Sequence, residues 1–282
     1  MITTKSIKKI RKSVSKARNN GKIIGFVPTM GALHKGHLSL INKAKKESDY
    51  LVVSIFINSL QFSPSEDFKS YPRKIKIDKR ILEKKKVDLL FYPQADKMYG
   101  PDFSSFVEET RLSKKLCGKS RPGHFKGVTT IVAKLFNIVQ PDLSFFGQKD
   151  YQQALIIKKM VKDLNFAIKI KTSPTIREKD KLALSSRNLY LNQKERKEAK
   201  AIYEALSQAK QMIKNNKRNP KKIIAEMRKI IEKRPRASID YIEIRNANNL
   251  EKIKKIEGKV FIGVAAYFGK TRLIDNIIVN KN

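Results

Sequence analysis

Residues 23–41 read IIGFVPTMGALHKGHLSLI, and this stretch contains the pattern that decides the fold. Its first five residues form a short apolar run that is typical of a buried strand. A loop with two glycines follows the run. From about His37 the apolar residues, among them Ile41 and Ala44, recur at the spacing of one helix face. The stretch predicts a strand, a loop and a helix in succession, which is the repeating unit of a parallel α/β sheet.

The same alternation continues through the first two thirds of the chain. The further runs that predict strands are residues 51–57, 87–92, 143–147 and 166–172. The stretches with helical spacing are residues 74–86, 127–139 and 151–164. The N-terminal 20 residues predict an amphipathic helix with Ile7, Ile10 and Val14 on one face. We therefore predict an α/β domain with a Rossmann-like parallel sheet.

The pattern changes after Pro174. Two Lys-rich stretches predict amphipathic helices, and three runs that follow them predict strands; the five are residues 193–214, 220–233, 238–246, 259–268 and 271–280. Strands that follow helices without alternation are typical of a small α+β domain. We therefore predict two domains, a Rossmann-like domain at residues 1–175 and a smaller α+β domain at residues 176–282.

Composition excludes several classes of protein. The chain has 282 residues, of which 40% are hydrophobic, so its length and composition allow a proper core. The single cysteine, Cys117, rules out an intrachain disulfide and suits a reducing cytosol. No apolar run is close to the length of about 20 residues that a helix needs to cross a bilayer. The basic N-terminus lacks the apolar region of a secretory signal. We expect a cytoplasmic protein without a membrane partner.

The formal net charge of +36 has two interpretations. Clustered Lys and Arg could neutralise nucleic-acid phosphates, or the lysines could be a general bias of composition. The lysines run along the whole chain, from Lys5 to Lys281, and no stacking aromatic residues are interleaved with them. This distribution favours the second interpretation, and we expect no specific nucleic-acid partner.

The segment His34-Lys35-Gly36-His37 lies between a predicted strand and a predicted helix. Two histidines three residues apart at a helix start can face the same side. Free N–H groups and the helix dipole favour an anion there, and glycine allows close approach of a phosphate. The segment predicts a phosphate site. It could instead be a surface loop with incidental histidines; a zinc site would need a third ligand that the spacing does not suggest.

Two further motifs could contact phosphates. Residues 147–150 read GQKD and end a predicted strand, at the sheet edge where open α/β sheets bind ligands. Residues 184–188 read LSSRN, and two hydroxyls followed by an arginine can surround phosphate oxygens. When either motif is considered alone, helix capping is the simpler explanation. A basic, hydroxyl-rich loop together with the two histidines favours adenylyl transfer.

Four blocks of sequence closely resemble the pantothenate synthetase (pantoate–β-alanine ligase) family. They are VPTMGALHKGHLSLI (27–41), SIFINSLQF (54–62), RPGHFKGVTTIVAKLFNIVQPDLSFFGQKDYQQ (121–153) and ALSSRNLYL (183–191). The resemblance implies a nucleotidyl transferase of the cytidylyltransferase-like superfamily that is generally a homodimer and uses ATP as substrate with Mg²⁺. It implies that ATP activates pantoate as pantoyl adenylate with release of pyrophosphate, and that β-alanine then displaces AMP to give pantothenate, a coenzyme A precursor.

The resemblance also assigns residues by motif. The residues implied to bind ATP are Met30, Gly31, Ala32, Leu33, His34, Lys35, Gly36, His37, Gly147, Gln148, Lys149, Asp150, Ile176, Leu184, Ser185, Ser186 and Arg187. Those implied to act in catalysis are His34, His37, Lys149 and Arg187, with His37 as proton donor. Gln61 is implied to hold pantoate and β-alanine, Gln153 to hold pantoate, and Asp78 to lie near Mg²⁺. The C-terminal domain is implied to close over the nucleotide.

Three positions depart from the family pattern. Ser59 replaces a usual proline and could loosen the loop that carries Gln61. Gln148 replaces an acidic residue and removes a negative charge. Lys181 replaces a usual glycine, so a left-handed turn there would cost about 1 kcal/mol.

Two rival functions remain open from the sequence. The superfamily includes aminoacyl-tRNA synthetases, although the chain is short and shows no anticodon-binding module. A non-enzymatic nucleic-acid-binding protein would make the histidine pair incidental.

Overall fold

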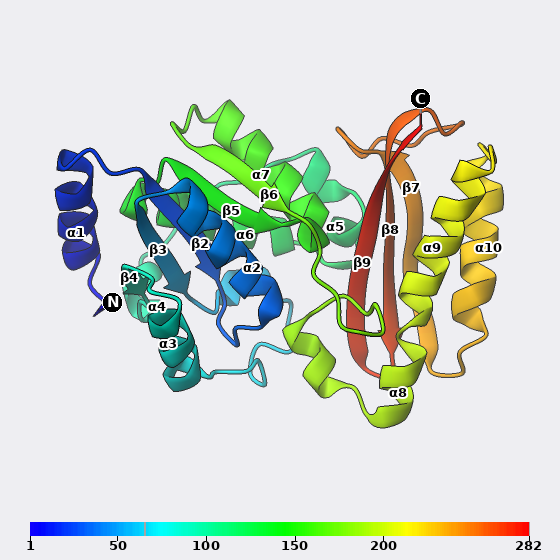
Figure 1. Ribbon diagram of the computed structural model, residues 1–282, viewed down its shortest axis with the longest axis horizontal. Coiled ribbons are helices and arrows are strands. Elements are labelled where there is room, and N and C mark those ends of the chain that lie inside the picture. Colours follow the sequence, from blue (N-terminus) through cyan, green and yellow to red (C-terminus); the bar gives the residue numbers. More distant parts are fainter. Residues whose placement is uncertain (65, 282) are drawn as a thin grey trace. The chain divides into compact units, whose positions relative to one another are not determined.

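The computed structural model describes residues 1–64 and 66–281 (Figure 1). The chain divides into two compact units, each described by itself. The first unit contains residues 1–113, 121–147 and 156–174, and the second contains residues 114–120, 148–155 and the chain from Thr175 onward. The predicted boundary near residue 175 did not anticipate the two short segments, which pack with the C-terminal part.

A parallel sheet of six strands forms the centre of the first unit, in the order β1-β4-β3-β2-β5-β6. The strands are β1 (Ile2–Thr4), β2 (Ile24–Thr29), β3 (Tyr50–Ile55), β4 (Leu89–Phe91), β5 (Leu143–Gly147) and β6 (Lys169–Ser173). All neighbouring pairs are parallel, and Gly25 of β2 pairs with Leu143 of β5. The chain order reverses between β2 and β5, and such a reversal is where open α/β sheets bind ligands at the carboxyl ends of strands.

Helices cover both faces of this sheet. They are α1 (Ile7–Asn19), α2 (Lys35–Glu47), α3 (Ile75–Lys84) and α6 (His124–Val139), with the short α4 (Ala95–Met98) beside them. On one face Val27 packs with Ile41 of α2 and with Leu82 of α3 in one apolar cluster. On the other face the ring of Phe26 meets that of Phe136 of α6, at 6.4 Å between centroids. Successive residues of β2 therefore enter opposite cores, as a doubly covered strand requires.

Helix α6 also approaches the 3-10 turn η1 (Ser59–Gln61) very closely. Gly127 makes this approach possible, because a Cβ at that position would lie 2.2 Å from the carbonyl oxygen of Leu60. The Nδ2 of Asn58 donates to the carbonyl of Gly127 at 3.0 Å and ties the turn to the helix. The position of η1 is therefore set by contact with a regular helix.

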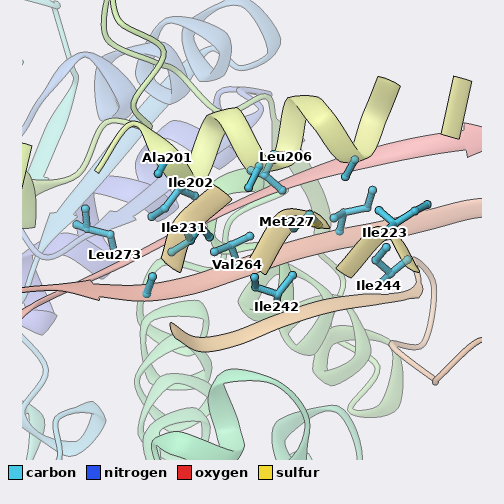
Figure 2. Packing of buried hydrophobic residues seen from close by; sticks show 14 of the residues in the cluster. Ala201, Ile202, Leu206, Ile223, Met227, Ile231, Ile242, Ile244, Val264 and Leu273 are labelled. Atoms are coloured by element: carbon cyan, nitrogen blue, oxygen red, sulfur yellow. The ribbon is translucent and has the colours of Figure 1, made fainter. Parts of the chain in front are cut away.

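The second unit is built on the antiparallel sheet β7-β8-β9. Its elements are β7 (Ala237–Asn246), β8 (Gly258–Phe268), β9 (Thr271–Lys281), α8 (Gln193–Glu198), α9 (Ala201–Lys214) and α10 (Pro220–Glu232). Helices α9 and α10 lie against one face of the sheet. Figure 2 shows the core between them, in which Leu206, Met227 and Val264 are fully buried. Asn219 caps α10, and Pro220 occupies its first turn, where no N–H partner is needed.

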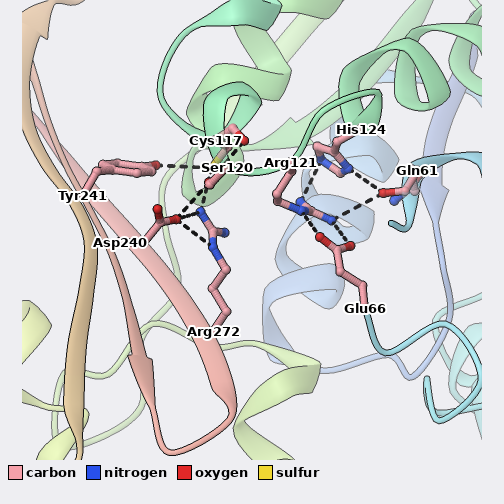
Figure 3. Close-up of polar contacts among 9 residues, drawn as sticks. All are labelled: Gln61, Glu66, Cys117, Ser120, Arg121, His124, Asp240, Tyr241 and Arg272. Atoms are coloured by element: carbon pink, nitrogen blue, oxygen red, sulfur yellow. Dashed lines mark hydrogen bonds and ion pairs between the residues drawn. The ribbon is translucent and has the colours of Figure 1, made fainter. Parts of the chain in front are cut away.

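Polar contacts explain why residues 114–120 and 148–155 pack with the C-terminal strands. In α5 (Cys117–Ser120) the Sγ of Cys117 lies 3.3 Å from the hydroxyl of Tyr241, and Arg272 pairs with Asp240 at 2.6 Å beside it (Figure 3). At the start of α7 (Tyr151–Asp163) the hydroxyl of Tyr151 donates to the carbonyl of Ala247 at 2.9 Å. Helix α7 thus begins in the second unit and ends in the first.

The predicted fold class is confirmed, and so are the main elements to within a few residues. Two features differ from the prediction. The N-terminus begins with the short strand β1, which pairs with β4, before the expected helix. The predicted helix at residues 193–214 is two helices, because the amide of Ile202 bonds to the carbonyl of Ala199 three residues back and tightens the chain. In the described residues no helix is both long and apolar enough to cross a membrane.

The close approach at Gly127 predicts the effect of adding one methyl group. Gly127→Ala should lower the free energy of unfolding by about 1–3 kcal/mol, because η1 or α6 must move to admit the Cβ. Gly100→Ala is the control, since a Cβ there meets nothing within 4 Å. Urea denaturation measures both variants. Equal stability of the two would contradict the packing described for η1.

Candidate active site

Two consecutive residues shortly after β2 have a left-handed backbone conformation. Gly31 has φ of +82° and Ala32 has φ of +50°. The first suits glycine, whereas the second costs an alanine about 1–2 kcal/mol. Strain of this kind persists only where surrounding contacts hold it.

The carboxylate of Asp78, in α3, supplies those contacts. Its Oδ2 accepts the N–H of Ala32 and its Oδ1 accepts the N–H of Leu33, each at 2.8 Å. The side chain is only 1% exposed. Burial raises the pKa of Asp78, and the two backbone N–H donors oppose that rise. Gly31 is needed for this arrangement as well, because a Cβ there would lie 3.0 Å from Oδ2.

The loop held by Asp78 ends at His34, which is the N-cap residue of α2. The Nδ1 of His34 accepts the N–H of Gly36 at 3.1 Å, and the Nδ1 of His37 accepts the N–H of His34 at 3.3 Å. The two rings therefore form a reciprocal capping box, with 4.1 Å between their centroids.

The capping contacts also fix which ring nitrogen carries hydrogen. A nitrogen that accepts a hydrogen bond has none, so each neutral ring of His34 and His37 carries its hydrogen on Nε2. The helix start thus has two imidazole N–H donors where the helix dipole already favours an anion. This arrangement can bind phosphate oxygens.

Gln61 lies at the end of η1, in the same unit as the histidines. Its Oε1 accepts from Nδ2 of Asn58 at 3.0 Å, and its Nε2 contacts the sulfur of Met30 at 3.1 Å. The hydroxyl of Tyr99 donates to Oδ1 of Asn58 at 2.6 Å, so Asn58 is held at both ends of its amide. The predicted effect of Ser59 on loop dynamics stays a prediction.

Lys149 and Asp150 belong to the second unit and form the 3-10 turn η3 (Gln148–Asp150) before α7. Strand β9 holds this turn through Asn276, whose Nδ2 donates to the carbonyls of Gln148 at 3.0 Å and Lys149 at 2.8 Å. The side chain of Asn276 is 3% exposed. Sequence patterns did not single out Asn276, because a buried amide in a strand has no local signature.

The segment from Ile176 to Arg187 is anchored to the same unit. Arg177 forms a two-pronged ion pair with Asp275 of β9, with 2.9 Å between Nη2 and Oδ1. Lys181 has φ of +73°, so the left-handed turn considered from the sequence is present. Ser185 accepts the N–H of Arg187 at 3.3 Å as the cap of η4 (Ser186–Tyr190). Nδ2 of Asn188 donates to Glu178 at 3.0 Å and to the carbonyl of Ala183.

The predicted site residues are thus distributed over both units. The first unit contains those from Met30 to His37, Gln61, Asp78 and Gly147. The second unit contains those from Gln148 to Asp150, Gln153, Ile176 and those from Leu184 to Arg187. Gln153 lies half-buried on α7. That these residues bind one nucleotide and its substrates stays a proposal.

The resemblance implies that Asp78 lies near Mg²⁺, and these contacts do not fit a ligand of that ion. Both carboxylate oxygens are engaged by backbone N–H groups, and the side chain is buried. Across residues 1–64 and 66–281 no three His, Cys, Asp or Glu side chains gather in a way that could hold a metal ion. The contacts make Asp78 the anchor of the loop between β2 and α2.

Replacing the Asp78 carboxylate by an amide tests this anchor. In Asp78→Asn one accepting oxygen becomes an NH₂ group that faces a backbone N–H, which should cost about 1–3 kcal/mol of stability. Hydrogen exchange at the amides of Ala32 and Leu33 should accelerate as the loop opens. Asp96→Asn, at an exposed position of α4, is the matched control. Unchanged exchange at both amides would remove Asp78 from this role.

The chain is similar to known enzymes along nearly its whole length. The family model described as pantoate-beta-alanine ligase matches residues 2–278. The curated pantothenate synthetase of Thermotoga neapolitana is 50% identical over 274 residues, which cover 97% of this chain and 98% of that protein.

Two solved structures share the architecture. Pantothenate synthetase from Thermus thermophilus superposes with a TM-score of 0.94 at 38% identity, covering 98% of this chain and 99% of that one. Pantoate-beta-alanine ligase from Francisella tularensis, complexed with beta-gamma ATP and beta-alanine, superposes with a TM-score of 0.82 at 38% identity, covering 99% of this chain and 97% of that one. With the match along nearly its whole length, the chain belongs to the pantoate-beta-alanine ligase family of enzymes.

Proposed function

We propose that the protein condenses pantoate with β-alanine to pantothenate at the expense of ATP, through a pantoyl-adenylate intermediate. The observation that carries the proposal is the histidine capping box at the start of α2, beside the reversal of strand order between β2 and β5. Family membership supports the overall reaction. The Francisella tularensis relative was solved with an ATP ligand and beta-alanine, which supports both as substrates.

In the first step a pantoate carboxylate oxygen attacks the α-phosphorus of ATP. The bond from this phosphorus to the bridging oxygen breaks, and pyrophosphate leaves with the electron pair. Negative charge builds on the phosphate oxygens, so donors that are already in place lower the barrier. The Nε2–H groups of His34 and His37 are such donors. We propose that His37 donates a proton to the departing pyrophosphate as the imidazolium, a form in which its Nδ1 carries a hydrogen and no longer accepts the N–H of His34.

In the second step the amine of β-alanine attacks the carbonyl carbon of the adenylate. The carbon–oxygen bond to phosphate breaks, AMP departs, and the amine loses a proton as the amide forms. No protein nucleophile is needed, so the enzyme contributes position and charge neutralisation. Gln61 is proposed to hold pantoate beside the amine, and the contacts of its side chain with Asn58 and Met30 support a fixed orientation.

The second unit is proposed to supply the cationic contacts. Lys149 and Arg187 neutralise phosphate charge, while Asp150, Ile176, Leu184 and the hydroxyls of Ser185 and Ser186 surround the nucleotide, and Gln153 binds pantoate. The Asn276 contacts to the turn that carries Lys149 support a fixed backbone there. Closure of this unit over the nucleotide is part of the proposal.

Mg²⁺ is proposed to arrive on the phosphates of ATP. Proteins commonly hold this ion through one or two carboxylates together with substrate phosphates, so a cluster of protein ligands is not required. A homodimer in the cytoplasm completes the proposal, by resemblance to the family.

The adenylation step is tested by isotope exchange. With ATP, Mg²⁺ and pantoate the protein should exchange labelled pyrophosphate into ATP, and AMP should accumulate only when β-alanine is added. Amino acids with tRNA, supplied in place of pantoate, should support neither reaction. An absence of pantoate-dependent exchange in folded protein would disprove the mechanism, and charged tRNA would favour the synthetase alternative.

Substitutions at the phosphate contacts should lower turnover without unfolding the protein. His37→Ala and Lys149→Ala should each reduce the exchange rate by roughly two to three orders of magnitude, the usual effect of losing one electrostatic stabiliser. Lys159→Ala is the control for Lys149, because Lys159 lies on α7 in an exposed ion pair with Asp163. Near-normal rates in both test variants would show that the phosphate site lies elsewhere.

A further inference from the structure

A polar network in the first unit contacts the backbone of Gln61 (Figure 3). Arg121 precedes α6, and His124 is the first residue of that helix. The guanidinium of Arg121 binds both carboxylate oxygens of Glu66, with 2.5 Å from Nε to Oε1 and 2.6 Å from Nη2 to Oε2. Its Nη1 lies 2.9 Å from Nε2 of His124.

The network ends on the backbone of Gln61. The carbonyl oxygen of Gln61 lies 2.7 Å from Nδ1 of His124 and 3.4 Å from Nη2 of Arg121. The side chain of Gln61 contacts Asn58 and Met30 instead. His124 and Arg121 therefore set where the Gln61 backbone lies and leave the amide to its other partners.

The partners of His124 determine its tautomer. A carbonyl oxygen can only accept, so Nδ1 must carry a hydrogen. A guanidinium can only donate, so Nε2 must accept and carry none. The ring is thus neutral with its hydrogen on Nδ1, the opposite of the arrangement inferred for His34 and His37.

The ion pair with Glu66 orients the guanidinium of Arg121 toward the ring of His124. The pair is largely buried, with 11% of the Arg121 side chain and 17% of the Glu66 side chain exposed. Two parallel bonds to a carboxylate fix the plane of a guanidinium, and a fixed plane aims the remaining N–H at the ring. The ring of His124 also meets that of Phe125, at 4.8 Å between centroids.

We propose that His124 is a positioning residue for Gln61, held as the Nδ1–H tautomer by the Glu66–Arg121 ion pair. The role rests on the proposed function, in which Gln61 binds pantoate and β-alanine. His124 acts through the backbone of Gln61. Its loss should therefore weaken binding of these two substrates while leaving ATP binding, which depends on the loop from Met30 to His37, nearly unchanged.

The tautomer can be measured without any assay of activity. Only three histidines occur in the chain, so ¹⁵N-labelled imidazoles give few signals, and the spectrum of His124→Asn identifies the one from His124. Two-bond ¹⁵N–¹H correlation at neutral pH should show His124 with a protonated Nδ1 and a bare Nε2. A protonated Nε2, as tautomer or imidazolium, would overturn the network.

Kinetics then test the positioning role. His124→Ala should raise KM for pantoate and for β-alanine on the order of tenfold, the scale of one lost hydrogen bond, with a much smaller change in KM for ATP. His124→Asn retains an N–H donor near the position of Nδ1 and should recover most of that loss. His124→Gln places its donor near Nε2, against the guanidinium, and should not recover it.

Glu66→Gln keeps the shape but removes the charge that fixes Arg121, so it should shift the same two constants in the same direction. Glu66→Gln also tests the positioning role if His124→Ala fails to fold. Glu108→Gln, at an exposed position, is its matched control. Equal KM changes for all three substrates, or no difference between the Asn and Gln variants, would overturn the role. If the wild-type protein catalyses no pantoate-dependent exchange, the proposed function fails instead, and the tautomer still tests the network.

Discussion

The buried carboxylate of Asp78 is the contact on which the candidate site depends. It accepts two consecutive N–H groups, from Ala32 and Leu33, and thereby holds the chain in a left-handed turn that alanine resists. The turn redirects the chain from the end of β2 into the N-cap of α2. Without it neither His34 nor His37 would reach its capping position. Burying a charged carboxylate costs free energy, and the two N–H groups that it accepts offset part of that cost.

The same principle recurs around the other predicted site residues. Gln61 is fixed through its backbone by His124 and Arg121, and Lys149 through its backbone by Asn276. In each case a side chain that is distant in the sequence hydrogen-bonds to a main-chain carbonyl oxygen. These backbone contacts do not use the side-chain amide of Gln61 or the ammonium group of Lys149. Preorganisation of this kind suits a reaction in which the protein forms no covalent bond and contributes position and electrostatics.

Sequence patterns predicted the strands, helices and motifs whose signals are local. The run before His34 and the apolar spacing after it identified β2 and α2, since both depend on neighbouring residues. Strand β1 was missed because three residues carry no periodicity and it is paired only through β4. The supporting contacts were missed for a related reason. Asp78 and Leu33 are separated by 45 residues, and Asn276 and Lys149 by 127, so only the folded chain brings them together.

The central claim is that pantoate is activated as an acyl adenylate, and the most direct measurement follows one oxygen atom. In the first step a pantoate carboxylate oxygen becomes the bridge to the α-phosphorus, and it stays on phosphorus when the amine displaces AMP. Pantoate labelled with ¹⁸O in its carboxylate should therefore give AMP that contains one ¹⁸O, detected by mass spectrometry. Pantothenate formed together with unlabelled AMP would contradict the account.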